Sequence, residues 1–324
     1  MRFNLLLKVS IGISISIVFL YFLLINIDIN QILLTFQKAD LFYIPFIFIF
    51  YLTSFAFRTL RWKIILKNVP DKKNSNLFSI LIIGFGFNNI LPLRLGELIR
   101  SYILKIKYKL SFVYALSTIF FEKIMDAIIL IIFAFLVIIF FPIPQWIESL
   151  SIIAAFIFSI LIFLYVILSF RGDWLLTKIK DKKYISRLSN PLSKIIESSH
   201  VLRGKGQIYV LVLSFLTWVM EFLAFYFTAL TLKLPIPLYV LILVMIVINI
   251  GIMIPSAPGY IGTFEAFAVL TLVAFGFSNS VAFSYAILIH AIQFVSITLL
   301  TILFIFTYKI SIKEILSMDV KKSE

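Results

Sequence analysis

The sequence predicts an all-α, polytopic integral membrane protein, and three observations lead to this fold class. Of its 324 residues, 62% are hydrophobic and the mean hydropathy is +1.11, whereas ordinary soluble domains are only about 45–50% apolar. Apolar runs long enough to cross a bilayer recur along the chain. Lys and Arg gather in alternate polar segments between these runs, as they do in cytoplasmic loops. Little of the chain remains for a soluble domain.

Six apolar runs are each about as long as the 20 or so residues that a spanning helix needs. They are residues 5–25, 41–60, 112–141, 150–170, 208–230 and 281–308. The first has no small-x-small cleavage site after it, so we expect a retained helix and not a signal peptide. Two further stretches, 76–104 and 238–277, are interrupted by Pro and Gly. Because membranes tolerate an open backbone only where protein or a polar cavity covers it, we expect two broken, re-entrant hairpins there.

The distribution of basic residues predicts which ends of the helices face the cytoplasm. The basic segments are 58–76, 105–111, 171–207 and the charged tail 309–324. The segments 26–40, 142–149 and 231–237 hold only Lys38 and Lys233. We therefore expect one transmembrane domain in the cell membrane with both termini in the cytoplasm. Residues 171–207 would be a basic cytoplasmic or interfacial segment, and the net charge of +14 indicates anionic lipid, not nucleic acid.

This topology has a consequence for the two broken hairpins. The hairpin within 76–111 would enter from the cytoplasm, and the hairpin within 238–280 from the outside. An inverted repeat gives this arrangement and places a binding site near the midplane. The two sequences agree in part, because Pro92 precedes Gly96 by four residues and Pro258 precedes Gly262 by four. A glutamate follows each glycine closely.

The most unusual stretch is Gly84 to Arg100, GFGFNNILPLRLGELIR, in which charges coincide with helix-breaking residues. Spacings of three would put Arg94, Glu97 and Arg100 on one face of a helix starting near Pro92. Guanidinium groups bind phosphate oxygens in a bidentate fork, which favours a phosphate clamp. The alternative is an Arg–Glu pair that neutralises itself at the interface. With Asn89 and Gly96, these residues form the first candidate half-site.

The second candidate half-site is PSAPGYIGTFE, from Pro255 to Glu265. Pro258, Gly259 and Gly262 favour a tight turn with an open backbone. A helix starting near Gly262 would point its N–H groups into the membrane, where they can bind an anion. The alternative is a kinked helix end.

Further ionisable residues lie within the predicted spans, where charge is costly and usually functional. Glu122, Lys123 and Asp126 can bind a cation, relay protons or pair with Arg94 and Arg100; the alternative is a set of structural ion pairs between helices. Arg58 and Arg61, at the end of the second span, are expected to be anchors that snorkel to the interface, with a role in the site as the alternative. Glu221 lies mid-span and its partner is unidentified. His290 and Gln293 share a face of the last span and are expected to hydrogen-bond another helix.

Several kinds of chemistry have no support in the sequence. The chain has no Cys and two His, which excludes disulfides and thiolate sites and leaves little for a histidine metal site. It contains no nucleotide-binding loop. We therefore expect no metal, no cofactor and no catalytic residue.

Four motifs together, FRTLRW, NNILPLRLGELIR, FEKIMD and PSAPGYIGTFE, make the chain resemble the lysylphosphatidylglycerol synthase transmembrane region, also called the flippase-like domain family. In multiple peptide resistance proteins this region precedes a cytoplasmic aminoacyl-transferase domain and moves the aminoacylated lipid between leaflets. No such domain follows Tyr308, so the resemblance implies a stand-alone flippase-like protein. The positions that match the motifs are Arg58, Arg61, Asn89, Pro92, Arg94, Gly96, Glu97, Arg100, Glu122, Lys123, Asp126, Pro258, Gly259, Gly262 and Glu265.

Three hypotheses about function follow from the sequence. The first is a translocator of a lipid or lipid-linked precursor, anionic or polyprenyl-phosphate in type, whose phosphate binds Arg94 and Arg100. The second is a partner or scaffold of a separately encoded lipid-modifying enzyme or glycosyltransferase. The third is an integral-membrane transferase acting on a lipid phosphate, with Glu97, Glu122 or Asp126 as base.

Overall fold

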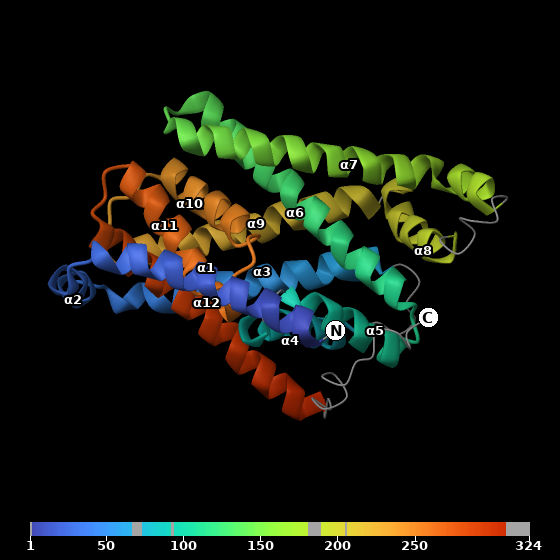
Figure 1. The fold of residues 1–324 in the computed structure, drawn as a ribbon, viewed down its shortest axis with the longest axis horizontal. Coiled ribbons are helices and arrows are strands. Elements are labelled where there is room, and N and C mark those ends of the chain that lie inside the picture. The colour runs from blue at the N-terminus through green and yellow to red at the C-terminus, as the bar shows by residue number, and fades with distance from the viewer. Residues whose placement is uncertain (1, 67–72, 92–93, 181–188, 205, 309–324) are drawn as a thin grey trace.

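The computed structural model describes residues 2–66, 73–91, 94–180, 189–204 and 206–308. Within these ranges the chain is helical and contains no strand (Figure 1). The helices are α1 (Arg2–Ile25), α2 (Ile29–Gln37), η1 (Leu41–Tyr43), α3 (Ile44–Ile65), α4 (Asn74–Ile90), α5 (Gly96–Tyr108), α6 (Phe112–Phe140), α7 (Gln145–Lys180), α8 (Ser189–Ser199), η4 (His200–Arg203), α9 (Gly206–Thr231), α10 (Leu238–Gly251), η5 (Pro258–Tyr260), α11 (Thr263–Ala274) and α12 (Asn279–Tyr308). Pro92 and the tail 309–324 lie outside the described residues.

The predicted fold class is confirmed. Five segments of the described chain are long and apolar enough to span a membrane: Leu41–Ile65, Phe112–Phe140, Gln145–Lys178, Gly206–Thr231 and Asn279–Thr307. Helices α1 and α2 are bent by 83° at the break between them. If this pair is counted as one broken span, the described chain has up to six spans. The protein is therefore an all-α, multi-pass membrane protein.

A helix–hairpin–helix unit occurs twice. The first unit is α3, the α4–α5 hairpin and α6; the second is α9, the α10–α11 hairpin and α12. The helices α3 and α9 pack along each other, α4 packs on α12, and α10 packs on α6. Each hairpin therefore packs on the last helix of the other unit. Figure 1 shows the two hairpins entering the bundle from opposite ends, which is the arrangement that the inverted-repeat prediction requires.

The first hairpin depends on a close approach of its two helices. Gly96, the first residue of α5, donates its N–H to Asn88 Oδ1 at the end of α4, over 2.8 Å. A Cβ atom at Gly96 would overlap the carbonyl oxygen of Gly84 on α4. Glycine at this position therefore allows the backbones of α4 and α5 to meet.

We expect Gly96→Ala to lower the thermal unfolding midpoint of the purified protein in detergent. Adding one methyl group to such a contact forces the backbone to shift, at a cost of about 1–3 kcal/mol. Gly204→Ala is the matched control, because a Cβ there would have no neighbour within 4 Å. Equal midpoints for the two variants would contradict the close approach of α4 and α5.

The structure differs from the sequence-based boundaries around the predicted segment 171–207. Helix α7 begins at Gln145, earlier than expected, and continues through Arg171 to Lys180 instead of ending near residue 170. No proline lies between Arg171 and Lys180, so the change from apolar to charged residues does not stop the helix there. Helices α8 and η4 return the chain to α9.

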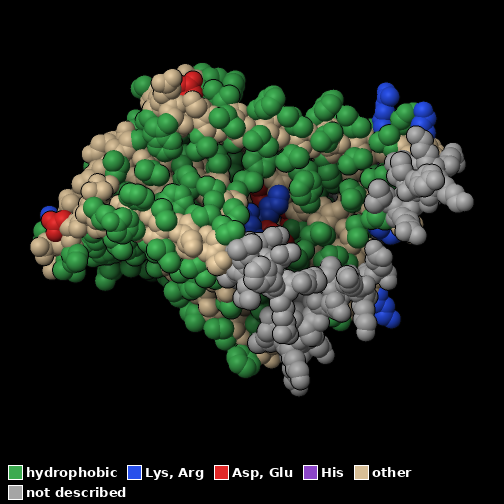
Figure 2. All heavy atoms as spheres, viewed as in Figure 1, with side chains coloured by type: hydrophobic (Ala, Val, Ile, Leu, Met, Phe, Trp, Pro, Cys, Tyr) green, Lys and Arg blue, Asp and Glu red, His purple; other side chains and the backbone are tan. Residues whose placement is uncertain are grey.

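The loops predicted to be cytoplasmic lie at one end of the molecule. The end of α5, the start of α6, the end of α7 and α8 are together on the right of Figure 1. Figure 2 shows Lys and Arg side chains at this end, whereas hydrophobic side chains cover most of the length between the two ends. A multi-pass protein needs such an apolar belt to lie in lipid.

Candidate functional site

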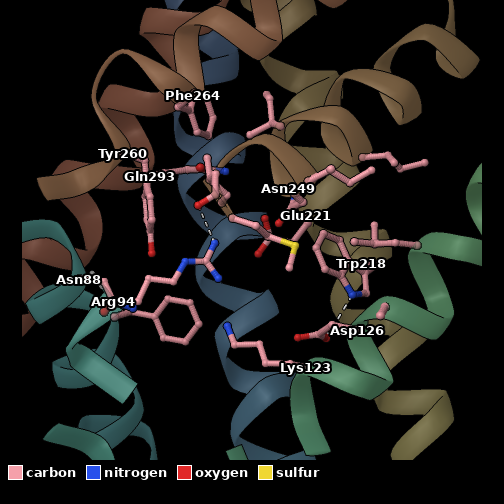
Figure 3. A pocket seen from close by; sticks show the side chains of 18 of the residues that line it. Asn88, Arg94, Lys123, Asp126, Trp218, Glu221, Asn249, Tyr260, Phe264 and Gln293 are labelled. Carbon is pink, nitrogen blue, oxygen red and sulfur yellow. Dashed lines mark hydrogen bonds between the residues drawn. The ribbon is translucent and has the colours of Figure 1, made fainter. Parts of the chain in front are cut away.

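A cavity of about 380 Å³ lies where the tips of the two hairpins meet. The first hairpin contributes Asn88, Asn89 and Arg94, and the segment between α10 and α11 contributes Ile252 and Tyr260. Further polar lining residues include Arg58 of α3, Lys123 and Asp126 of α6, Glu221 of α9, Asn249 of α10, and His290 and Gln293 of α12. Figure 3 shows Arg94 and Lys123 extending into this space, with Asp126 and Glu221 on its far side.

The same cavity has an apolar arm. It continues between α6 and α7, where its walls include Ala134, Ala154, Ala155 and Phe158. The small alanine side chains keep this space open. One end of the cavity is therefore charged and another is lined by hydrocarbon.

The cavity opens on the side of the bundle. Phe120 of α6 and Met253, after α10, both line it and are 48% and 52% exposed, so they mark its mouth. Figure 2 shows charged side chains inside a hollow in an otherwise hydrophobic face. The polar interior is thus reached laterally, from the belt that faces lipid.

In the wall of the cavity, two arginines and two carboxylates form a buried network. Arg58 contacts Asp126 and Glu221, each over 3.1 Å, and Arg61 contacts Asp126 over 2.6 Å. Trp218 and Ser54 complete it by donating to Asp126 and Glu221. Two positive and two negative charges cancel, which offsets much of the cost of removing them from water.

The prediction that Arg58 and Arg61 snorkel to the interface is wrong. Their exposed fractions are only 7% and 1%. They lie on the part of α3 that packs against α6 and α9, which carry Asp126 and Glu221, so the charge is neutralised inside the bundle. The network also supplies the missing partner of Glu221.

Arg100 and Glu122 form a second buried pair, with Arg100 Nη2 lying 2.6 Å from Glu122 Oε2. The Arg100 guanidinium also lies over the Trp62 ring, 3.5 Å from its centroid, a cation–π contact. Arg100 is 3% exposed and is not among the residues that line the cavity. Of the alternatives open for Glu122, the structure shows an interhelical ion pair with Arg100.

The expected helix face with Arg94, Glu97 and Arg100 is not formed. Helix α5 begins at Gly96, and Arg94 precedes it with a left-handed backbone (φ 54°). The turn directs Arg94 into the cavity while Arg100 packs on Trp62. Glu97 instead pairs with Lys123 over 3.3 Å, in a more exposed position.

Arg94 differs from the other cationic residues of the cavity. Its Nη2 donates to the carbonyl oxygen of Ile252 over 2.9 Å, and its guanidinium lies 5.5 Å from the centre of the Tyr260 ring. Arg58 and Lys123 each have a carboxylate partner. Across the described ranges, no carboxylate lies within ion-pair distance of Arg94. A partly buried cation that lacks a counter-ion is well placed to bind an anionic ligand.

The two asparagines at the first tip mainly brace the hairpin. Asn88 caps Gly96, as described above, and Asn89 Nδ2 donates to Phe294 O and Thr298 Oγ1 of α12. Asn89 was predicted to bind the substrate. It does line the cavity, but its amide nitrogen already has two acceptors.

The tip of the second hairpin, between α10 and α11, is a turn in which three residues have positive φ angles: Gly259 (68°), Tyr260 (62°) and Gly262 (90°). Pro258 opens it as the first residue of η5. The Gly262 N–H donates to Glu265 Oε2 over 2.7 Å. Of the N–H groups at the start of α11 that were predicted to bind an anion, that of Gly262 is therefore already taken, because the chain's own Glu265 caps the helix.

Some residues of the site were not singled out from the sequence. Asn249 and Tyr260 line the cavity, and Trp218 donates to Asp126. The sequence does contain an indication of Asn249, because it is a lone polar residue near the end of an apolar run. His290 does hydrogen-bond another helix, as expected, and its partner is Glu265 of α11. Within the part of the chain that the structure describes, no three His, Asp or Glu side chains cluster as a metal site would require.

The fold and the cavity define a polytopic α-helical membrane protein with a charged, laterally open cavity inside its bundle. Residues 9–301 match the family described as the Lysylphosphatidylglycerol synthase TM region, and the chain belongs to this family. The family resemblance read from the motifs is therefore confirmed.

Two relatives that match the chain are described as membrane proteins. A UPF0104 membrane protein of Methanocaldococcus jannaschii is 22% identical over 90% of this chain and 93% of its own length. A UPF0104 membrane protein of Methanothermobacter thermautotrophicus is 26% identical over 89% of this chain and 91% of its own. No solved structure gives a significant match. Each relative is thus matched over nearly its whole length.

Proposed function

We propose that this protein binds a lipid with an anionic head group in the cavity and moves it between the leaflets of the cell membrane. The observation that carries the proposal is Arg94, a cation that faces the cavity without a carboxylate partner among the described residues. A phosphate accepts two parallel hydrogen bonds from a guanidinium group, which suits this position.

The remaining cavity lining fits an amphipathic ligand better than a free anion. Asn249, Tyr260 and Gln293 supply hydrogen-bonding groups around Arg94. The apolar arm between α6 and α7 offers a hydrocarbon surface continuous with this polar end. The mouth at Phe120 and Met253 faces the apolar belt, so a lipid can enter without leaving the membrane.

The arrangement of the hairpins supports translocation. Two broken hairpins from opposite ends meet at the cavity, an arrangement in which one half can move against the other around a fixed site. The carboxylates Asp126 and Glu221 offset the buried arginines. By the asymmetry of Lys and Arg we place the basic end in the cytoplasm.

Native mass spectrometry of the gently solubilised protein tests the head-group site. We expect phosphatidylglycerol or farnesyl phosphate, each added as a probe, to remain bound to the wild type and to be lost from Arg94→Gln. Losing a hydrogen bond to a charged group costs about 1.5–3 kcal/mol, or roughly 10- to 100-fold in affinity. Arg171→Gln is the matched control, because Arg171 is an exposed arginine of α7 outside the cavity.

The two probes separate the lipid classes, since they share a phosphate but differ in their tails. Equal binding to the wild type and to Arg94→Gln would contradict the assignment of the head-group site. If neither probe is found on the wild type or on either variant, the result would favour the hypothesis that the protein is a scaffold for a separate enzyme.

A further inference from the structure

His290 of α12 is buried, and both of its ring nitrogens face oxygen atoms. Nδ1 lies 2.5 Å from Glu265 Oε1 of α11, and Nε2 lies 2.9 Å from the carbonyl oxygen of Gly259. The Phe264 ring stacks on the imidazole with centroids 4.2 Å apart, which fixes the plane of the ring. His290 therefore joins α12 to α11 and to the turn that precedes it.

These contacts require a proton that neutral histidine beside ionised glutamate does not supply. A carbonyl oxygen only accepts, so Nε2 carries a hydrogen atom. A neutral imidazole has one N–H, so Nδ1 would then present a lone pair to Glu265. Two lone pairs in such close contact repel, so one more proton lies between them, on His290 or on the carboxyl group.

The pair is connected to Arg94 through the segment between α10 and α11. Gly259, which accepts from His290, precedes Tyr260, whose ring faces Arg94. The other end of the segment holds Arg94 through the carbonyl oxygen of Ile252. Glu265 also accepts the N–H of Gly262, where the turn ends. The His290–Glu265 pair thus fastens the turn that lies beside the anion site.

We propose that His290 and Glu265 form a proton-binding site that is linked to the anionic head group at Arg94. This linkage rests on the proposed function. Loss of the proton leaves a net negative charge beside the cavity and makes the contact between Nδ1 and Glu265, which joins α12 to the helix that follows the turn, repulsive. Both effects weaken the binding of an anion at Arg94. Proton and head group therefore bind together, and each raises the affinity for the other by the same factor.

The ionisable side chains around the pair can be named for the residues that the structure describes. Helices α2 and α4, which pack against α12, carry no ionisable side chain, and α11 carries only Glu265. The other ionisable side chains described on helices that pack against α11 and α12 are Tyr21, Tyr51, Arg58, Arg61, Lys63, Tyr209, Glu221, Tyr226 and Tyr239, with Arg94 and Tyr260 beside the turn. Arg58 and Glu221 are already paired with each other.

The protein is well suited to a direct measurement, because it has only two histidines. We would record nitrogen NMR spectra of 15N-histidine-labelled protein in nanodiscs of phosphatidylcholine, with and without phosphatidylglycerol. His200→Gln assigns the two signals by elimination without touching the site, since His200 lies in η4. The spectra show directly how many protons each imidazole carries at each pH.

We expect the spectra to show an additional proton on the His290–Glu265 pair, its loss as the pH rises, and a changed His290 signal in Glu265→Gln. Phosphatidylglycerol should raise the midpoint of this titration by about one pH unit, which corresponds to a tenfold linkage. The His200 signal reports any change in surface potential that phosphatidylglycerol causes. Only the part of the His290 shift that exceeds the His200 shift is therefore evidence for the linkage. Arg94→Gln should remove the additional shift.

The contrary outcomes are distinct. A His290 that keeps a single proton across the range in which histidine normally titrates, unchanged in Glu265→Gln, would overturn the proton site. Equal shifts of His290 and His200 would overturn the linkage. A His290 titration that depends on Glu265, in a protein that binds no anionic lipid by mass spectrometry, would refute the proposed function and retain the proton site.

Discussion

Asp126→Asn is expected to destabilise the protein more than any other single charge removal in the bundle. Asp126 is the shared partner of Arg58 and Arg61, and it also accepts from Trp218. Without it, two guanidinium groups remain buried with one carboxylate between them. Breaking a buried pair by removing one partner costs about 3–5 kcal/mol. We expect a large fall in the thermal unfolding midpoint, measured by fluorescence or by monodispersity after heating.

The control for this prediction is Glu97→Gln. Glu97 and Lys123 also form an ion pair, but their side chains are 25% and 40% exposed. Exposed pairs contribute about 0.2–1 kcal/mol, so the unfolding midpoint should hardly change. Adding Arg61→Gln to Asp126→Asn should recover part of the loss, because it removes one unpaired charge. A double variant that loses the sum of both single effects would contradict a shared buried network.

Ala155→Phe is expected to reduce lipid translocation at least tenfold while leaving the fold intact. Ala155 is on the wall of the apolar arm between α6 and α7, and the larger ring would fill the space that we assign to the lipid tail. Helix α7 is largely exposed, so it can carry the added volume without disturbing the core. The measurement is the flipping of fluorescent phosphatidylglycerol in proteoliposomes, followed by dithionite quenching.

The matched control is Ile157→Phe, since Ile157 is on the outer side of α7 and is 51% exposed. It adds an aromatic ring to the same helix outside the cavity, so translocation should proceed at the wild-type rate. An Ala155→Phe protein that folds and translocates normally would show that the apolar arm does not hold the tail. In that case Arg94 would bind a head group whose tail lies in another part of the membrane.

The sequence by itself determined the fold class, most of the helices and part of the set of residues that line the cavity. Each of these rests on a local property. An apolar run of spanning length must be helical in lipid, and charge beside Pro and Gly in such a run is too costly to be accidental. The two hairpins, with Arg94 at one tip and Gly259 at the other, followed from these rules alone.

Only the tertiary structure decided which charges neutralise one another. Arg58 finds Asp126 and Glu221 at separations of 68 and 163 residues, and no local spacing can show this. The same holds for Arg100 with Glu122 and for His290 with Glu265. Ion pairs in the bundle form across helices. Arg94, which faces the cavity without a carboxylate partner among the described residues, could therefore be recognised only once the partners of the other arginines were known. The left-handed backbone of Arg94 then turned a predicted clamp of two arginines into a site with one.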